Sequence, residues 1–350
     1  MNINRRQFIT TLGVSSLLTQ IAPTIAQNTI SPLTIIKPPR LKIGDTIGLI
    51  SPAGIIENQD IENAKETFQK LGLNIKIGTH ILDRHGYLAG TDINRTKDIH
   101  LMFTDPSVKA IMAMRGGWGC NRLLPLLNYS LIRSYPKIII GYSDITSLLL
   151  AINARSRLIT FHGGVATSTW NKFTVDYFQR ILFDGELLTM ENSSTPEGNI
   201  EKITPGQAQG KLIGGNLSVI AAMIGSAYLP SWHNNILFVE DIGEDVYRID
   251  RMLTQLKNAG ILNQISGFIF GQCTNCQVSE QPSFTLKQIL QQHIQPLNIP
   301  AWYGSMIGHV KDKFTIPVGL KVEIDADYGT IKMLEASVMV GDREQVTGNR

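Results

Sequence analysis

A serine at the end of a buried strand is the clearest candidate for chemistry in this sequence. The apolar run 138–140 ends at Gly141, and a helical pattern begins just after Ser143. A serine on such a turn has its hydroxyl raised above the sheet, and the amides that open the helix stabilise nearby negative charge. The motif Gly-Tyr-Ser-Asp differs from the Gly-x-Ser-x-Gly of α/β-hydrolases. Two interpretations therefore stay open: Ser143 is a nucleophile, or it is the N-cap of the helix.

A glycine-rich stretch, 115–119 (Arg-Gly-Gly-Trp-Gly), occupies the equivalent place one strand–helix unit earlier. Glycines there let backbone amides approach a ligand and form an anion-binding nest. Neighbouring strands of a parallel sheet end at one crevice, so we expect Gly117 and Ser143 to face each other. The alternative is a plain glycine turn next to a core Trp118. The stretch also lacks the Lys-Ser/Thr ending of a phosphate-binding loop.

A nucleophilic serine needs a general base, and the base needs an acid that orients it. Five of the seven histidines lie in polar or helical contexts without companion signals. The other two are His162, which follows a strand and precedes two glycines, and His309, which lies in the stretch 308–319. Glu240 ends the apolar strand 237–239, where a carboxylate is either functional or solvated.

The cysteines give no sign of a metal or cofactor site. Cys273 and Cys276 form a single C-x-x-C pair, and a structural zinc site needs four ligands. We therefore predict no metal and no cofactor. The pair is expected to be packing residues or one disulfide.

The elements that must position these residues alternate between strand and helix from residue 46 to about 161. This order is typical of parallel βαβ units whose helices cover the sheet. Predicted strands are 46–51, 73–77, 108–114, 137–140 and 158–161, and predicted helices are 60–71, 91–103, 122–127 and 145–153.

The pattern changes after about residue 165. The polar segment 187–209, with two prolines and two glycines, is predicted to be a linker between domains. The sequence thus predicts an N-terminal α/β domain over 41–186 and a second domain over 210–345. In the second domain, predicted helices are 217–224, 246–259 and 286–293, and predicted strands are 236–239, 265–270 and short segments up to residue 340.

Composition agrees with two globular domains. The chain has 350 residues, 43% of them hydrophobic and 17% charged, which argues against a disordered or coiled-coil chain. With 32 basic and 29 acidic residues the net charge is only +3, so no nucleic-acid partner is predicted.

The first 26 residues are predicted to be a twin-arginine signal peptide. Arg5 and Arg6 precede a weakly apolar run, which ends in the small residues of a cleavage site at Ala26. The alternative is a disordered basic N-terminus. The run is shorter than a membrane-spanning helix, so we expect only transient contact with the membrane. The signal peptide itself predicts that the protein is exported. Residues 27–40, rich in proline, are expected to be an extended lead-in.

The motifs taken together resemble one family, the LD-carboxypeptidases, serine peptidases that trim murein tetrapeptides, with a related branch that hydrolyses microcin C7. The matching stretches are in family order and cover essentially the whole mature chain. They are IGLISPAG at 47, GYLAGTD at 86, RGGWG at 115, GYSDIT at 141, GKLIGGNLS at 210, FVEDIGEDVYRIDRML at 238, GFIFGQCTNC at 267 and GHVKDKFTIPVG at 308.

The resemblance implies a catalytic triad of Ser143, Glu240 and His309, with Ser143 as nucleophile and His309 as base. It implies that the backbone amides of Gly117 and Asp144 form an oxyanion hole. The implied fold is an N-terminal parallel-sheet α/β domain plus a C-terminal β-rich α/β domain, with the active site in the cleft between them and commonly a homodimer. Four further residues are expected to contact substrate from their positions alone: Arg115, Gly116, Trp118 and Asn216.

The function expected from the resemblance is release of the terminal D-alanine from murein tetrapeptides, so the predicted partner is a murein peptide. Hydrolysis of a microcin C7-like peptidyl-nucleotide, or of another amide, is an alternative within the same class. An alternative of another class is an exported peptide-binding protein in which Ser143 only caps a helix.

Overall fold

The computed structural model describes residues 34–194, 198–279 and 281–340. The first sheet has six strands in the order β12-β5-β4-β3-β1-β2, and all neighbours except β12 and β5 are parallel. Its strands are β1 (Thr46–Ile50), β2 (Asn74–Ile77), β3 (Val108–Ala113), β4 (Ile138–Gly141), β5 (Thr160–His162) and β12 (Ile316–Val318). The central strands β3 and β4 are almost entirely buried, as expected for a parallel sheet covered on both faces.

The second sheet has eight strands in the order β6-β14-β13-β8-β9-β10-β11-β7. The middle strands β8 to β11 are parallel, and the outer pairs are antiparallel. Its strands are β6 (Thr189–Met190), β7 (Glu201–Thr204), β8 (Gln207–Asn216), β9 (Ile236–Ile242), β10 (Gly267–Thr274), β11 (Ala301–Tyr303), β13 (Lys321–Asp325) and β14 (Thr330–Met333). The predicted combination of a parallel α/β sheet and a β-rich second sheet is confirmed.

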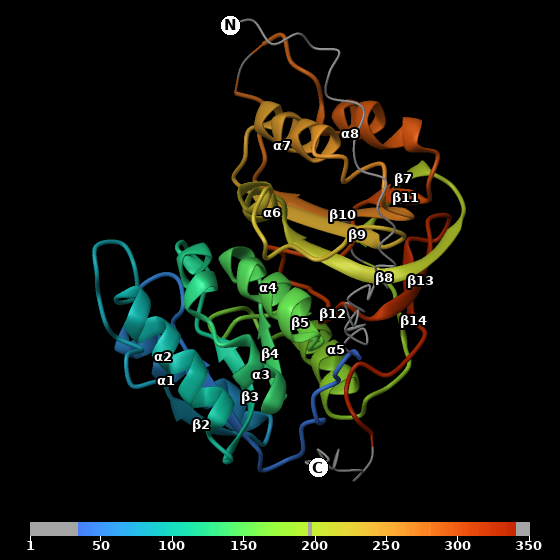
Figure 1. The fold of residues 1–350 in the computed structure, drawn as a ribbon. Helices are drawn as coiled ribbons and strands as arrows, with labels where there is room; N and C mark the ends of the chain where they lie inside the picture. Colours follow the sequence, from blue (N-terminus) through green and yellow to red (C-terminus); the bar gives the residue numbers. More distant parts are fainter. Residues whose placement is uncertain (1–33, 195–197, 280, 341–350) are drawn as a thin grey trace, which may run out of the picture. The chain divides into compact units, whose positions relative to one another are not determined.

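Helices accompany both sheets, and α6, α7 and α8 lie together beside the second sheet (Figure 1). The α-helices are α1 (Asn58–Lys70), α2 (Asp92–Thr104), α3 (Tyr129–Ser134), α4 (Thr146–Ser156), α5 (Lys172–Leu182), α6 (Leu217–Met223), α7 (Val246–Asn258) and α8 (Leu286–Ile294). The 3₁₀ segments are η1 (Cys120–Leu126), η2 (Ser143–Ile145) and η4 (Gln295–Leu297). Helix α4 contacts β8 and α6, so it packs against elements of both sheets. Within the described ranges, no helix is both long and apolar enough to span a bilayer.

Three features differ from the sequence-based expectation. Helix α5 was not predicted, although its N-cap Asn171 accepts a hydrogen bond from the Thr174 amide at 3.0 Å. The segment predicted as a helix over 122–127 is the 3₁₀ segment η1, which contains Pro125. The predicted linker 187–209 contributes β6, β7 and the start of β8 to the second sheet, because its backbone pairs with distant strands that local sequence does not reveal.

One strand of the predicted second domain joins the first sheet. β12 comes from the C-terminal part of the chain, yet it pairs antiparallel with β5 of the first sheet, with Ile316 opposite His162. The loop that carries His309 therefore runs from the second sheet into the first. The predicted signal peptide, residues 1–26, lies outside the described residues, as does the start of the lead-in. The rest of the lead-in is extended and forms single bridges at Ile36 and Pro39.

Candidate active site

Ser143 lies on the tight turn that joins β4 to η2 and α4. Its φ is +63°, a left-handed conformation that non-glycine residues seldom adopt outside functional sites. The N-cap of η2 is Tyr142, so the interpretation of Ser143 as a simple N-cap is not supported. The neighbouring loop comes very close, since a Cβ on Gly116 would lie 2.7 Å from Ser143 Cβ. Glycine at that position is required for the close approach of the two loops.

His309 and Glu240 form a hydrogen-bonded pair. His309 Nδ1 lies 2.8 Å from Glu240 Oε2, and the glutamate at the end of β9 is completely buried. Binding the carboxylate through Nδ1 leaves Nε2 of the ring free to accept a proton, as a general base requires. Gly308, at φ +111°, allows the approach, because a Cβ there would lie 2.5 Å from Glu240 Oε2.

Asn216 is hydrogen-bonded to Glu240 of this pair, so a substrate contact alone does not explain its position. Its Nδ2 donates to Glu240 Oε1 and to Asp241 Oδ1, both at 3.2 Å, and its Oδ1 accepts from the Val219 amide as the N-cap of α6. The side chain is buried and all its polar atoms are used. The structure therefore assigns Asn216 first to holding Glu240, where position alone had indicated a substrate contact.

A second hydrogen bond ties the nucleophile's helix to the second sheet. The Asn216 amide donates to Thr146 Oγ1 at 3.0 Å, and Thr146 is the first residue of α4. Ser143 and Glu240 come from different sheets. Thr146 lies three residues after Ser143, and Asn216 is the last residue of β8. The hydrogen bond between them therefore fixes the position of Ser143 relative to Glu240.

Ser143 lies where two cavities meet. The smaller, about 300 Å³, is lined by Asp60, Arg115, Gly116, Gly117, Tyr142, Ser143, Val165, Thr167 and His309. The larger, about 470 Å³, is lined by Arg115, Gly117, Trp118, Asn121, Ser143, Asp144, Asn216, Ser218, Val219, Ala222, Asp241, Ile242 and Glu244. Together they contain every residue predicted for the site except Glu240, which is buried behind His309. No hydrogen bond joins Ser143 Oγ to His309 in the described part of the chain. Such bonds commonly tighten only when substrate is present.

The predicted oxyanion hole is consistent with this geometry. Gly117 lines both cavities, and within the described residues its N–H donates to no backbone or side-chain acceptor. Asp144 follows the nucleophile at the start of η2, where backbone amides lack helical partners. Its carboxylate accepts from the Cys120 amide at 2.8 Å, and burial raises its pKa. That these two amides form an oxyanion hole stays a prediction.

The second candidate base, His162, has a very different environment. It is buried, both ring nitrogens lack a hydrogen-bond partner, and burial lowers its pKa to about 4. The ring packs against Phe238 at 5.4 Å between centroids. A histidine that stays neutral, lacks a carboxylate and lines neither cavity is a packing residue here.

Sequence reasoning missed three residues near the site: Tyr142, Asp241 and Lys313. The ring of Tyr142 lies 4.7 Å from that of His309, with Lys313 Nζ 5.7 Å from its centroid, so it lies between the nucleophile's turn and the base. Burial lowers the pKa of Lys313 to about 8. Burial, with the neighbouring charge of Glu240, raises the pKa of Asp241 to about 7. The position of Tyr142 directly before Ser143 was the only available signal.

Cys273 and Cys276 form a disulfide, which resolves the two interpretations left open by the sequence. Thr274, between them, donates from Oγ1 to the His309 carbonyl at 3.0 Å. The disulfide turn therefore supports the loop that carries His309. In the described ranges, no group of three or more His, Cys, Asp or Glu side chains is arranged to hold a metal ion.

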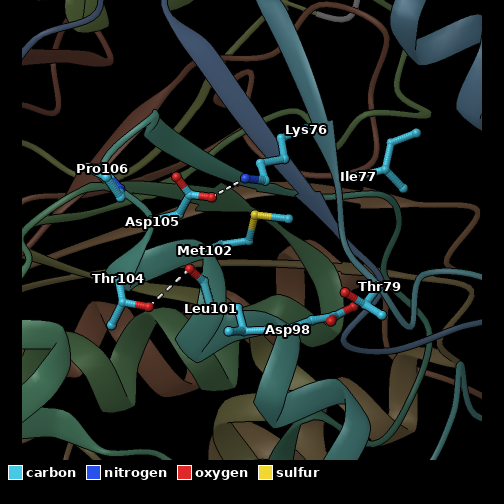
Figure 2. Close-up of a pocket in the computed structure, with 9 residues that line it drawn as sticks. All are labelled: Lys76, Ile77, Thr79, Asp98, Leu101, Met102, Thr104, Asp105 and Pro106. Carbon is cyan, nitrogen blue, oxygen red and sulfur yellow. Dashed lines mark hydrogen bonds and ion pairs between the residues drawn. The ribbon is translucent and has the colours of Figure 1, made fainter.

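A third cavity lies away from this site, between β2 and α2 (Figure 2). It has a volume of about 390 Å³. Lys76 is paired with Asp105, and Thr104 donates to the Leu101 carbonyl at 3.2 Å. Asp98 accepts from the His80 amide at 2.8 Å through Oδ2, and its buried Oδ1 has no partner. It contains no nucleophile next to a base.

Comparison with known proteins agrees with this site. Residues 47–163 match the LD-carboxypeptidase N-terminal domain, and residues 209–324 match the C-terminal domain of the same family. The chain is 36% identical to the probable murein peptide carboxypeptidase of Bacillus subtilis, over 87% of this chain and 96% of the relative.

Two solved structures are also similar. The microcin C7 self-immunity protein MccF has a TM-score of 0.80 at 26% identity, over 87% of this chain and all of MccF. The muramoyltetrapeptide carboxypeptidase of Oxalobacter formigenes has a TM-score of 0.74 at 28% identity, over 82% of this chain and 97% of that one. With both domains, their order and the fold in agreement, the chain belongs to the LD-carboxypeptidase family and is a carboxypeptidase.

Proposed function

We propose that this carboxypeptidase uses a serine mechanism to hydrolyse the bond between the L-centre of a diamino acid and a terminal D-alanine in murein tetrapeptides. The observation that carries the proposal is the pairing of His309 with buried Glu240 beside the cavity that holds Ser143. The names of the relatives, murein peptide carboxypeptidase and muramoyltetrapeptide carboxypeptidase, support the substrate class.

The reaction begins when Ser143 Oγ attacks the scissile carbonyl and His309 Nε2 takes the hydroxyl proton. Glu240 holds the imidazole by Nδ1 and stabilises its positive charge. The amides of Gly117 and Asp144 donate to the oxyanion of the tetrahedral intermediate. His309 then gives the proton to the departing amine of D-alanine. A water molecule, activated by the same histidine, attacks the acyl-enzyme, restores the Ser143 hydroxyl and releases the shortened peptide.

Arg115 is placed to bind a carboxylate of the substrate. It borders both cavities, and its Nη1 donates to the Ile55 carbonyl at 3.3 Å. Trp118 is 60% exposed and lines the larger cavity, where it can cover an apolar part of the peptide.

The alternative within the same class is hydrolysis of a microcin-like peptidyl-nucleotide, favoured by the fold shared with MccF. The alternative of another class, an exported peptide-binding protein, does not explain a buried carboxylate that orients a histidine next to the serine. A pure binder would gain nothing from the cost of burying Glu240.

The experiment that tests the function is mass spectrometry of muropeptides incubated with the mature protein. We expect disaccharide tetrapeptides to lose D-alanine and become tripeptides, and the Ser143→Ala variant to leave them intact. Intact tetrapeptides combined with cleavage of a peptidyl-nucleotide would favour the microcin-type alternative. No product from either substrate would favour the binding protein.

We further propose that the protein is exported in folded form and acts outside the cytoplasm as a homodimer. The twin arginines support export, and the family resemblance supports the dimer. Replacement of Arg5 and Arg6 by lysine should abolish export, and delivery of that variant through the general pathway would contradict it. Light scattering of the mature protein should give twice the mass of one chain, and a single-chain mass would contradict the dimer.

A further inference from the structure

The larger cavity next to Ser143 is lined on one side by carboxylates. Asp144, Asp241 and Glu244 all border it, with Arg115 at the boundary with the smaller cavity. Because Arg115 borders both cavities, its charge does not distinguish them. The excess of acidic groups is confined to the larger one.

Two of the three carboxylates are used within the protein. Asp144 accepts from the Cys120 amide at 2.8 Å. Asp241 accepts from the amides of Ser218 and Ile242, both at 2.9 Å, in addition to Asn216. Neither has much capacity left for a ligand.

Glu244 differs from them. Its Oε2 is buried without a hydrogen-bond donor, and the nearest cation, Arg248 Nη1, lies 3.8 Å away on a side chain that is 56% exposed. The backbone is held firmly, because the Gln277 amide donates to the Glu244 carbonyl at 3.1 Å and the Gly243 amide donates to Thr274. A carboxylate fixed in a cavity wall and short of donors is suited to a ligand that brings its own N–H groups.

The position of His309 tells which part of a substrate enters each cavity. His309 lines the smaller cavity and is absent from the larger. The base must later protonate the departing amine, so the leaving residue lies on the His309 side. The acyl residue, on the other side of Ser143, therefore occupies the larger cavity together with Glu244.

We propose that Glu244 binds a cationic group on the side chain of the acyl residue, such as the ω-ammonium of a diamino acid, and so selects for it. This inference rests on the proposed carboxypeptidase function and adds the residue that recognises the side chain of the acyl residue. Acyl residues with acidic side chains would be repelled by the same wall.

The test compares two tetrapeptides that differ only in the residue before the terminal D-alanine: lysine, or norleucine, which lacks the ammonium. For the wild-type protein we expect kcat/KM to be roughly 10–100-fold higher with lysine, the range of a hydrogen bond to a charged group. In Glu244→Gln this preference should fall to within about threefold. Glu66→Gln removes the same charge from exposed α1 and should keep the wild-type ratio.

Equal cleavage of the two peptides by the wild-type protein would overturn the inference without any variant. An unchanged lysine preference in a folded, active Glu244→Gln would also overturn it. In both cases D-alanine release would leave the proposed function standing. Failure of the wild-type protein to release D-alanine from either peptide, or from muropeptides, would instead remove the proposed function and the inference with it.

Discussion

Two histidine rings lie near the ring of Tyr142, and only one of them has the surroundings expected of a catalytic base. His309 is partly exposed, borders the cavity at Ser143 and is bound to Glu240 at 2.8 Å. His162 lies 6.1 Å from the same tyrosine ring, but it is buried without a partner for either nitrogen. Burial, with a further contribution from His309, lowers the pKa of His162 to about 4, whereas His309 is hydrogen-bonded to a buried carboxylate.

The comparison shows that proximity to the nucleophile does not make a base. The two histidine rings differ in the residues that surround them. Behind His309 stands the end of β9, with Glu240 held by Asn216, and around His162 stand Phe238 and Tyr142. The predictions below remove these differences one at a time.

The largest effect is expected from the nucleophile and its base. Ser143→Ala and His309→Ala should each lower kcat by roughly 10⁴–10⁶, because neither attack nor proton transfer can proceed. Turnover of a tetrapeptide by purified variants measures this, with circular dichroism as the check on folding. A folded His309→Ala that keeps activity while His162→Ala loses it would reverse the assignment of the base.

Glu240→Gln should cost somewhat less, roughly 10³–10⁴ in kcat, since the shape is kept and only the charge that orients the imidazole is lost. Combining it with His309→Ala should add little further loss, because the two act as one unit. Losses that multiply in the double variant would show that Glu240 acts independently of the histidine.

Asn216→Ala tests whether this residue holds Glu240 or binds substrate. The variant leaves Glu240 Oε1 without its donor and removes the N-cap of α6, so kcat should fall by roughly 10–100-fold and stability by about 1–3 kcal/mol. Steady-state kinetics separates the two roles. A rise in KM at unchanged kcat would return Asn216 to the substrate-binding role that its position first indicated.

The smallest effect on activity is expected for His162→Phe, which should keep kcat within about threefold because the ring fills the same apolar site. Its effect is on acid stability. In the folded state the pKa of His162 is about 4, against about 6.5 unfolded, so its contribution to folding is complete above pH 6.5 and is lost as the pH falls towards 4. Between pH 7 and pH 4, the His162→Phe variant should therefore lose about 3 kcal/mol less stability than the wild-type protein.

Urea unfolding at pH 7 and at pH 4 measures this difference. The wild-type protein should lose more stability between the two pH values than His162→Phe. Equal losses would mean that His162 is not neutral in the folded state, and the contrast between the two histidines would fail.

Much of the fold could be predicted because its signals are local. The apolar run 138–140 and the Thr91 N-cap, which accepts from the Asn94 amide at 3.2 Å, are visible in the sequence and are confirmed. The pairing of β12 with β5 could not be predicted, since nothing in the three residues Ile316–Val318 specifies a partner so far along the chain. The same holds for the strands of the predicted linker.

The candidate site shows the same division. The strand-to-helix turn identified Ser143 from its neighbours, whereas choosing between His162 and His309 needed the family resemblance. The structure adds the physical reason, which lies in residues far apart in sequence: Glu240 behind one ring and Phe238 behind the other. The contacts of Asn216 with Glu240 and Thr146 were not predicted, because they join residues that lie far apart in the sequence.

Reaction with a fluorophosphonate, followed by peptide mapping and activity assay, tests the central claim most directly. The account predicts one phosphonate on Ser143 with a proportional loss of carboxypeptidase activity, no labelling in His309→Ala, and normal labelling in His162→Phe. Full activity in protein that is completely modified at Ser143, or inactivation with the label on another residue, would contradict it.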